Sequence, residues 1–426
     1  MLFGGNGRKD DLVLEGIRVV DPTQGIDEVL TVTVEKGVIT RLEPTAATAN
    51  SRIVAPGFVD PHVHLRTPGR EDEEDIASGT RAAAAGGYCA ILAMPNTDPV
   101  VDSAAVLGAL VERAEVEAEI PVGFLAAISK RQEGGELTEM IELAERGAAG
   151  FSDDGRPVVS AGLLRRALQY HEVAGRPIAL HCEEPALSRS GQMHEGIVSA
   201  ELGFHGYPSV AESVMVGRDL ALAAHEGQPI HLLHLSARES VEALHQAQAT
   251  GVAATGEVTP HHLCLTDEAV RSLDPNLKMN PPLRSEEDRQ ALIEGVKDGT
   301  IAAIATDHAP HAAYEKDVPF EEAPFGVTGL ETAFAVLNTR LIEPGILSLG
   351  TVLERLSAGP ARIYGLEPPR IAVGAPANLV VLDLEATWCV AHDEFRSRSA
   401  NSWLLGSTLK GKVVRTVADG KIAFAA

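Results

Sequence analysis

The chain has 426 residues, of which 60 are acidic and 36 are basic, so its formal net charge at neutral pH is −24. Nucleic-acid binding depends on clustered Lys and Arg, and this charge therefore argues against a nucleic-acid partner. The hydrophobic share of 45% and the charged share of 23% are ordinary for a soluble globular protein, and no apolar run is long enough to predict a membrane span.

Short strands are expected at both ends of the chain. β-Branched residues and turn punctuation predict strands at 12–20, 29–34 and 38–42, with a turn at 35–37. The tail repeats this texture: strands are expected at 378–384 and in two segments of 412–422 that an Asp-Gly turn joins. We infer that residues 1–55 and 367–426 join in one small β-sandwich domain.

Between these ends, over 56–366, strand–loop–helix units repeat. Strands are expected at 58–64, 88–94, 122–127, 150–152, 178–181, 230–235, 251–255 and 301–305. Helices are expected at 103–118, 136–146, 161–174, 237–249, 286–297 and from 328 onward. About eight such units favour an α/β fold with a TIM-like (β/α)8 barrel over an open sheet.

Several strand ends carry residues that bind metal ions. His62 and His64 lie two residues apart on the first strand of the barrel, so they point to the same face and can hold one ion. His181, His234 and Asp307 each follow a short apolar run. Because the C-terminal strand ends of a barrel converge on one mouth, these residues can meet there. Imidazole ligands favour zinc or a similar transition metal.

The number of candidate ligands bears on the number of ions. Four His and two Asp exceed what one tetrahedral ion with an open position can use, so a pair of Zn²⁺ ions with a bridging carboxylate is expected. The bridging candidate is one of two adjacent residues, Asp153 and Asp154, in the segment FSDDG (151–155) after the fourth strand. The same segment is also typical of a turn, since Asp-Gly favours one, and spacing leaves both interpretations open.

Other polar residues near the strand ends suit catalysis and substrate binding. Asp307 fits a general base beside an activated water, although an aspartate at this position could also cap a helix. Arg66 can offer a bidentate fork to a substrate carboxylate. Asn96 and Asn280 lie on loops after strands, where they are either substrate contacts or turn residues. His261 and His262 are expected to pack loops.

The cysteines bear on the cellular compartment. Four Cys residues are widely scattered without a Cys-x-x-Cys pair, which predicts neither a zinc knuckle nor a disulfide framework. The first residues lack the apolar core of a signal peptide. We therefore expect a cytoplasmic protein.

Five segments together resemble the class I dihydroorotases of the amidohydrolase superfamily, and the resemblance covers nearly the whole chain. They are DPHVHLRTPG (60–69), MPNT (94–97), FSDDG (151–155), MNPPLR (279–284) and TDHAPH (306–311). Many relatives in the superfamily bridge their metals with a carboxylated lysine at the fourth strand. This chain has aspartate there, which is the class I pattern and which leaves one or two Zn²⁺ ions open.

The resemblance implies roles for individual residues. His62, His64 and Asp307 would bind the first zinc, Asp154 would bridge, and His181 and His234 would bind the second. Asp307 would also be the catalytic base. The implied substrate contacts are His64, Arg66, Asn96, Asn280, His311, Phe325 and Gly326.

The implied reaction is the reversible cyclisation of N-carbamoyl-L-aspartate to L-dihydroorotate with loss of water, a step of pyrimidine synthesis. In the hydrolytic direction a metal-bound hydroxide attacks the ring amide, and Asp307 delivers its proton to the departing nitrogen. Two alternatives are a dihydropyrimidinase, hydantoinase or allantoinase, and an inactive dihydroorotase-like scaffold for aspartate carbamoyltransferase. That transferase is also a candidate partner of an active enzyme, and a homodimer is expected.

Overall fold

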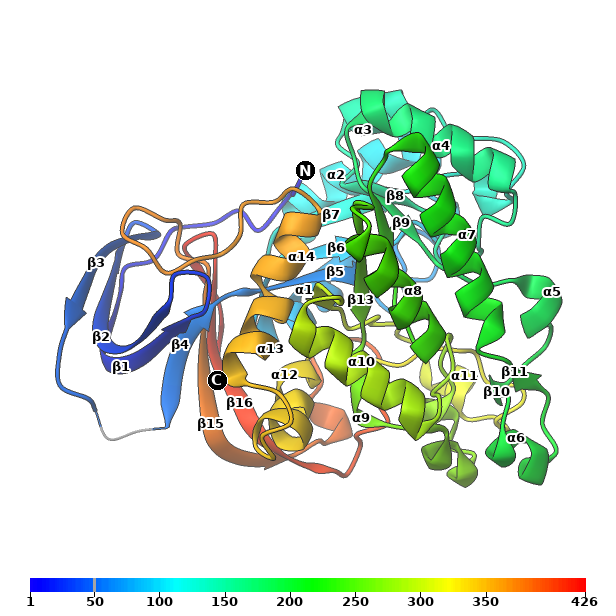
Figure 1. Ribbon diagram of the computed structural model, residues 1–426. Helices are drawn as coiled ribbons and strands as arrows, with labels where there is room; N and C mark the ends of the chain where they lie inside the picture. Colours follow the sequence, from blue (N-terminus) through cyan, green and yellow to red (C-terminus); the bar gives the residue numbers. More distant parts are fainter. Residues whose placement is uncertain (49–50) are drawn as a thin grey trace.

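Two sheets organise the chain, as the computed structural model shows for residues 1–48 and 51–426. One is a barrel of parallel strands surrounded by helices, and the other is formed by the two ends of the chain and stands beside the barrel (Figure 1). Among the helices of the described residues, none combines the length and the apolar character that a bilayer-spanning helix requires.

The barrel strands follow one another in chain order around the sheet. They are β5 (Phe58–Val63), β6 (Tyr88–Ala93), β7 (Val122–Ala126), β8 (Gly150–Ser152), β9 (Ile178–Leu180), β12 (Ile230–Leu232), β13 (Ala254–Val258) and β14 (Ala303–Ile304). A parallel bridge between Val63 and His308 joins the last strand region to the first, and the backbone N–H of His64 donates to the carbonyl of His308 over 2.9 Å. The barrel is therefore closed just beyond β14.

Helices cover the outside of the barrel. The longer ones are α1 (Ile76–Ala85), α2 (Ala104–Glu117), α3 (Met140–Arg146), α4 (Ala161–Ala174), α7 (Val210–Glu226), α8 (Arg238–Ala249), α10 (Glu286–Asp298) and α13 (Leu349–Leu356). Local sequence sets their ends: α10 begins at a capping box formed by Ser285 and Asp288 and ends at Gly299, whose φ of +94° suits glycine.

Short elements fill the loops and the last part of the barrel. They are α5 (Pro185–Ser188), β10 (Met193–His194), α6 (Ile197–Leu202), β11 (Gly206–Tyr207), α9 (Pro260–Cys264), α11 (Ala313–Lys316), α12 (Ala333–Leu337) and α14 (Ala358–Ile363), together with 3-10 turns at Lys130–Gln132, Asp267–Ser272, Pro275–Leu277 and His392–Glu394 and a π turn at Asn338–Ile342.

The second sheet, which we call the terminal sheet, has the strand order β17-β16-β15-β4-β1-β2-β3. Its strands are β1 (Leu12–Asp21), β2 (Ile26–Glu35), β3 (Val38–Pro44), β4 (Arg52–Pro56), β15 (Leu379–Cys389), β16 (Thr408–Ala418) and β17 (Lys421–Ala425). Val19, Val32, Ile39, Leu379 and Val417 form part of its aliphatic core. Strands from both ends of the chain therefore share one core.

Two of the predicted hairpin turns are confirmed in this sheet. The turns between β2 and β3 and between β16 and β17 each contain two residues with positive φ, at Lys36 and Gly37 and at Asp419 and Gly420. Such turns match the twist of antiparallel strands, and Gly accepts the conformation without a steric penalty.

The predicted fold class is confirmed, although the helices α1 and α7 were not predicted and two strands differ from the prediction. The seventh barrel strand was predicted at 251–255 but runs over Ala254–Val258. The residues that pair with β12 and β14 begin only at Ala254. β4 was not predicted; it pairs with β1 and β15 and leads directly into the barrel.

Candidate metal centre and active site

The six predicted metal ligands meet at the C-terminal end of the barrel strands. His62 lies in β5 and His64 directly after it, and Asp154, His181, His234 and Asp307 follow β8, β9, β12 and β14. All six are shielded from solvent: Asp307 has the most exposed side chain of the set, at 13%. Strand ends separated by more than two hundred residues thus form one cluster.

The two imidazoles of β5 each use one ring nitrogen to fix their orientation. Nδ1 of His62 lies 2.7 Å from Oε1 of Glu257, and Nδ1 of His64 lies 2.9 Å from Oδ1 of Asn96. The other nitrogens turn toward the carboxylates: Nε2 of His64 is 3.0 Å from Oδ1 of Asp307, and Nε2 of His62, which is buried and has no hydrogen bond, is 3.5 Å from the same atom. Each ring therefore offers one nitrogen to the centre of the cluster.

The other two imidazoles face each other. Nδ1 of His181 lies 2.9 Å from Nε2 of His234, and Nε2 of His181 lies 3.0 Å from Oε2 of Glu183. If Glu183 accepts the proton on Nε2, then Nδ1 of His181 is left with a lone pair directed at the second ring. These two nitrogens could hold one metal ion between them.

Asp154 lies between the two pairs of imidazoles. Its Oδ1 is 3.4 Å from His234 and 3.7 Å from His181, whereas its Oδ2 is 3.6 Å from His64. Oδ1 also lies 3.6 Å from Nε2 of His62, so this one carboxylate is within reach of all four imidazoles. Asp153 instead accepts hydrogen bonds from the backbone N–H groups of Ile128 and Ser129, so it supports the loop after β7.

The ligand atoms are close enough together for cation binding. Those of His62, His64 and Asp307, and those of His62, Asp154 and His234, lie within 4.8 Å of one another in each group. The protonation equilibria reflect the same crowding. Burial alone would raise the pKa of the two carboxyl groups and lower that of His62, but the charges outweigh it, so the pKa of Asp154 and of Asp307 falls and that of His62 rises. The cluster thus attracts positive charge.

Backbone conformation at the mouth departs from the ordinary regions. Arg66, His234 and Asp307 have positive φ values of 57°, 29° and 48°. Non-glycine residues adopt such values rarely and at some energetic cost, and they concentrate at functional sites where the surrounding structure holds them.

The predicted substrate contacts lie beside the cluster and differ in how their groups are engaged. Nη2 of Arg66 is 3.4 Å from Nε2 of His311, and Nδ2 of Asn96 is 3.4 Å from Oδ2 of Asp154. Nδ2 of Asn280 donates to Glu183 over 3.1 Å, and its buried Oδ1 has no partner among the described residues.

The backbone groups of the predicted loop contact are already paired. The carbonyl of Phe325 lies 2.8 Å from Nε2 of His311. The N–H of Gly326 donates to the carbonyl of Lys278 over 2.9 Å, and its carbonyl accepts from Asn401. These backbone groups can therefore bind a substrate only if they share their present hydrogen bonds with it or give them up.

The sequence analysis missed Glu257, which is completely buried in β13. Its two oxygens contact Nδ1 of His62 and, over 3.0 Å, Nε2 of His231. Burial opposes ionisation, but hydrogen bonds from the two imidazoles lower the pKa of Glu257 to about 2. A charged residue inside a buried strand is rare and was the available signal, but the predicted strand ended before it.

Of the other two adjacent His residues, His262 has the loop-packing role that was expected. Nδ1 of His262 lies 2.8 Å from the hydroxyl of Thr259, and its Nε2 lies 3.0 Å from the carbonyl of Pro281. His262 therefore ties α9 to the loop that carries Asn280.

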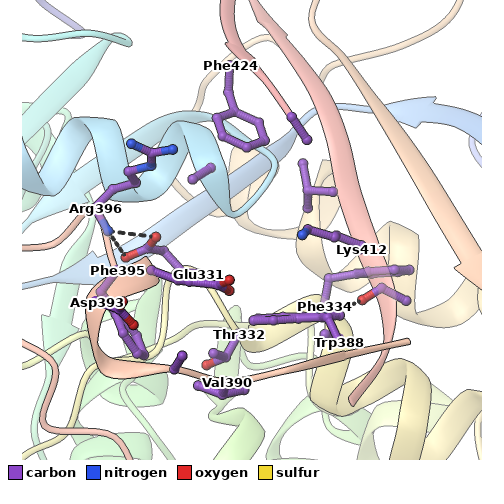
Figure 2. Close-up of a pocket in the computed structure, with 17 residues that line it drawn as sticks. Glu331, Thr332, Phe334, Trp388, Val390, Asp393, Phe395, Arg396, Lys412 and Phe424 are labelled. Atoms are coloured by element: carbon purple, nitrogen blue, oxygen red, sulfur yellow. Dashed lines mark hydrogen bonds between the residues drawn. The ribbon is translucent and has the colours of Figure 1, made fainter. Parts of the chain in front are cut away.

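A separate cavity lies between the barrel and the terminal sheet. It has a volume of about 420 Å³, and aromatic side chains of Phe334, Trp388, Phe395 and Phe424 surround it (Figure 2). The predicted metal ligands and substrate contacts are not among the described residues that line it.

Comparison with known proteins gives a consistent result. Residues 53–423 match the amidohydrolase family. The chain is 44% identical to a dihydroorotase of Geobacter metallireducens, covering 97% of this chain and 99% of the relative, and 46% identical to a dihydroorotase of Anaeromyxobacter sp. strain K, covering 97% and 98%.

Among solved structures, the chain is similar in fold to an L-hydantoinase from Arthrobacter aurescens, with a TM-score of 0.86 and 24% identity over 97% of this chain and 95% of that one. A dihydropyrimidinase from Brevibacillus agri has a TM-score of 0.83 and 20% identity, covering 98% of this chain and 95% of that one.

Proposed function

The chain belongs to the amidohydrolase family and, within it, to the dihydroorotases, and on that premise we propose that it catalyses the reversible cyclisation of N-carbamoyl-L-aspartate to L-dihydroorotate and water. The observation that carries the proposal is the cluster of four imidazoles and two carboxylates at the barrel mouth, with the guanidinium of Arg66 close enough to interact with the charge of Asp307. This combination suits an amide whose ring also bears a carboxylate.

The donor set fits two zinc ions. His62, His64 and Asp307 would hold the first, His181 and His234 the second, and Asp154 would bridge them. A single ion is the alternative that the same residues allow. When bound, such ions polarise an amide carbonyl and make a water molecule more acidic.

Asp307 is the proposed general base and acid. Its Oδ1 lies 3.0 Å from Nε2 of His64, and its side chain is partly open to the mouth. In hydrolysis it would take the proton of the attacking water and return it to the ring nitrogen as the C–N bond breaks. In cyclisation the same carboxylate would take one proton from the carbamoyl nitrogen and pass it to the departing oxygen of the substrate carboxylate, and a second proton from solvent completes the water molecule.

The remaining contacts would bind the parts of the substrate that do not react. We assign the ring carboxylate to Arg66 and His311, which lie side by side. Asn96 and Asn280 offer amide groups to the ring, His64 lies alongside it, and the backbone of Phe325 and Gly326 borders it. A planar guanidinium gives a carboxylate two parallel hydrogen bonds.

A hydantoinase or dihydropyrimidinase is the rival enzyme, because solved structures with those names share the fold. Arg66 distinguishes the two candidate functions, because a cyclic amide substrate without a carboxylate has no group that would pair with this guanidinium. An inactive scaffold for aspartate carbamoyltransferase is the rival outside catalysis, and the complete set of ligands argues against it.

The test is a parallel steady-state assay of the zinc-loaded protein with L-dihydroorotate, hydantoin and allantoin. We expect a strong preference for dihydroorotate, and Arg66→Ala is expected to abolish that preference by raising KM. A preference for hydantoin, or full turnover of dihydroorotate by Arg66→Ala, contradicts the proposal. Absence of turnover of all three in a protein that retains zinc supports the scaffold.

We also expect a cytoplasmic homodimer, with residues 1–55 and 367–426 forming one domain and residues 56–366 the other. Aspartate carbamoyltransferase is the candidate protein partner. Size-exclusion chromatography with light scattering, on the chain alone and mixed with that enzyme, tests both expectations.

A further inference from the structure

Glu73 is a completely buried carboxylate for which the proposed function so far has no role. It lies in the turn between β5 and α1, and its side chain has no exposed surface. Its backbone is fixed on both sides, because its N–H donates to the carbonyl of Arg70 and its carbonyl accepts from the hydroxyl of Ser399 over 2.7 Å. Burying a charge is costly unless an opposite charge lies beside it.

The opposite charge is the guanidinium of Arg66. Oε2 of Glu73 lies 2.8 Å from Nε of Arg66, and Arg70 contacts Oε1 from the solvent side. Neither oxygen of Glu73 accepts a well-aligned hydrogen bond, since the N–H of Arg66 Nε points to the carbonyl of Pro310 at 3.1 Å. The contact between Glu73 and Arg66 is therefore mainly electrostatic.

The charge on Glu73 depends on the guanidinium beside it. Burial raises the pKa of Glu73 to about 7, and Arg66 is the strongest influence that lowers it. Arg66 therefore favours the ionised form of Glu73, whereas burial and the neighbouring Glu315 oppose it.

The orientation of the guanidinium follows from these contacts. Nε faces Glu73 and Pro310, whereas Nη2 lies 3.4 Å from Nε2 of His311. The edge of the guanidinium that carries the two Nη groups is therefore left for a ligand on the side of His311. A carboxylate needs that edge for two parallel hydrogen bonds.

We propose that Glu73 is a positioning residue that holds the Arg66 guanidinium in the orientation that receives the substrate carboxylate, and so sets the preference for a carboxylate-bearing substrate. The inference rests on the proposed function. Preorganisation of this kind lowers the entropy cost of binding and acts on the affinity for the substrate rather than on the chemical step.

Glu73, His311 and Glu315 also form a group whose ligand atoms lie within 4.8 Å of one another. A third metal ion there would stand against two guanidinium groups, because Arg66 and Arg70 already contact these carboxylates. We therefore assign Glu73 to Arg66, and a loss of bound metal on removal of its charge would overturn this assignment.

The test is a double-mutant cycle with Glu73→Gln and Arg66→Ala, assayed with L-dihydroorotate. Glu73→Gln keeps the shape of the side chain and removes its charge. We expect KM to rise about tenfold and kcat to stay within about twofold in the otherwise unchanged protein. In the Arg66→Ala background Glu73→Gln is expected to change KM no further, because a residue that acts through Arg66 has nothing left to position.

Controls make the outcomes distinct. Glu117→Gln removes a partly buried carboxylate 2.9 Å from Nε of Arg113 and is expected to leave KM unchanged. If Glu73→Gln does not fold, Glu73→Asp keeps the charge but shortens its reach, and an intermediate KM is expected. An unchanged or lower KM, or the same rise in both backgrounds, overturns the inference. Failure of the proposed function looks different, since the unmodified zinc-loaded protein would then not turn over dihydroorotate.

Discussion

The barrel mouth and the terminal sheet bury opposite kinds of side chain. The core of the terminal sheet consists of aliphatic residues such as Val19, Val32 and Ile39. The mouth instead buries imidazoles and carboxylates, among them His62 and Glu257, each of which has no exposed surface. Aliphatic burial stabilises a fold, whereas buried ionisable groups cost desolvation energy that their partners only partly return. The sheet therefore serves stability and the mouth serves chemistry.

The largest expected effect tests the mouth alone. Asp307→Asn removes the proposed general base but keeps the size of the side chain, so we expect kcat to fall by about 10²–10⁴-fold. The thermal midpoint is expected to stay the same or to rise, because a buried charge is lost. Steady-state kinetics measures kcat, and a melting curve measures the thermal midpoint. A kcat above a tenth of the original contradicts the role given to Asp307.

The second prediction tests the sheet alone. Ile39→Ala leaves a cavity in the aliphatic core, where Ile39 has no exposed surface, and should lower the free energy of unfolding by about 2–5 kcal/mol. Activity of the folded fraction is expected to be unchanged. Urea denaturation and kinetics at low temperature measure both. Val38→Ala, at a neighbouring residue that is 37% exposed, is the matched control and should have little effect.

The third prediction concerns Glu257, which contacts the proposed metal ligand His62 but is not itself a proposed ligand. Glu257→Gln removes the charge that orients His62, and we expect zinc affinity to fall about 10–100-fold. Competition with a chromophoric chelator measures it without an activity assay. Glu286→Gln, an exposed carboxylate paired with Arg289, serves as control. Equal affinities of the variant and the unmodified protein would show that His62 needs no such support.

The smallest expected effect lies where the two regions meet, at Glu331 in the cavity of Figure 2. Burial raises the pKa of Glu331 from 4.5 to about 7, although backbone N–H groups of Ser397 and Arg396 oppose the shift. The folded state therefore binds more protons than the unfolded state between these pH values, so this contribution to stability is complete below about pH 4.5 and is lost as the pH rises to about 7.

Glu331→Gln cannot titrate at this position. Its stability relative to the unmodified protein should therefore increase between pH 4.5 and pH 7, by on the order of 1 kcal/mol. Urea denaturation at several pH values measures the difference. A difference that does not vary with pH would mean that Glu331 is ionised throughout.

Much of this organisation was predictable because it is local. Apolar runs of strand length alternate with amphipathic segments, and this alone indicated the barrel. His62 and His64 indicated a metal centre because two imidazoles on one strand face share a direction. Five of the six proposed ligands do fall in two close groups, and the sixth, His181, contacts His234. Asp153 and Asp154 could not be separated in this way, since adjacent residues differ only in where their side chains point.

The sequence by itself determined which residue types stand at the strand ends and, through them, the family and the expectation of a metal centre. Only the tertiary structure decided which nitrogen of each imidazole faces the centre, which acid orients it, and that Glu73 faces Arg66. The physical reason is distance along the chain: His62 and Glu257 are 195 residues apart, and their 2.7 Å contact exists only because the barrel closes. A local sequence pattern cannot indicate a contact between two residues that only the folded barrel brings together.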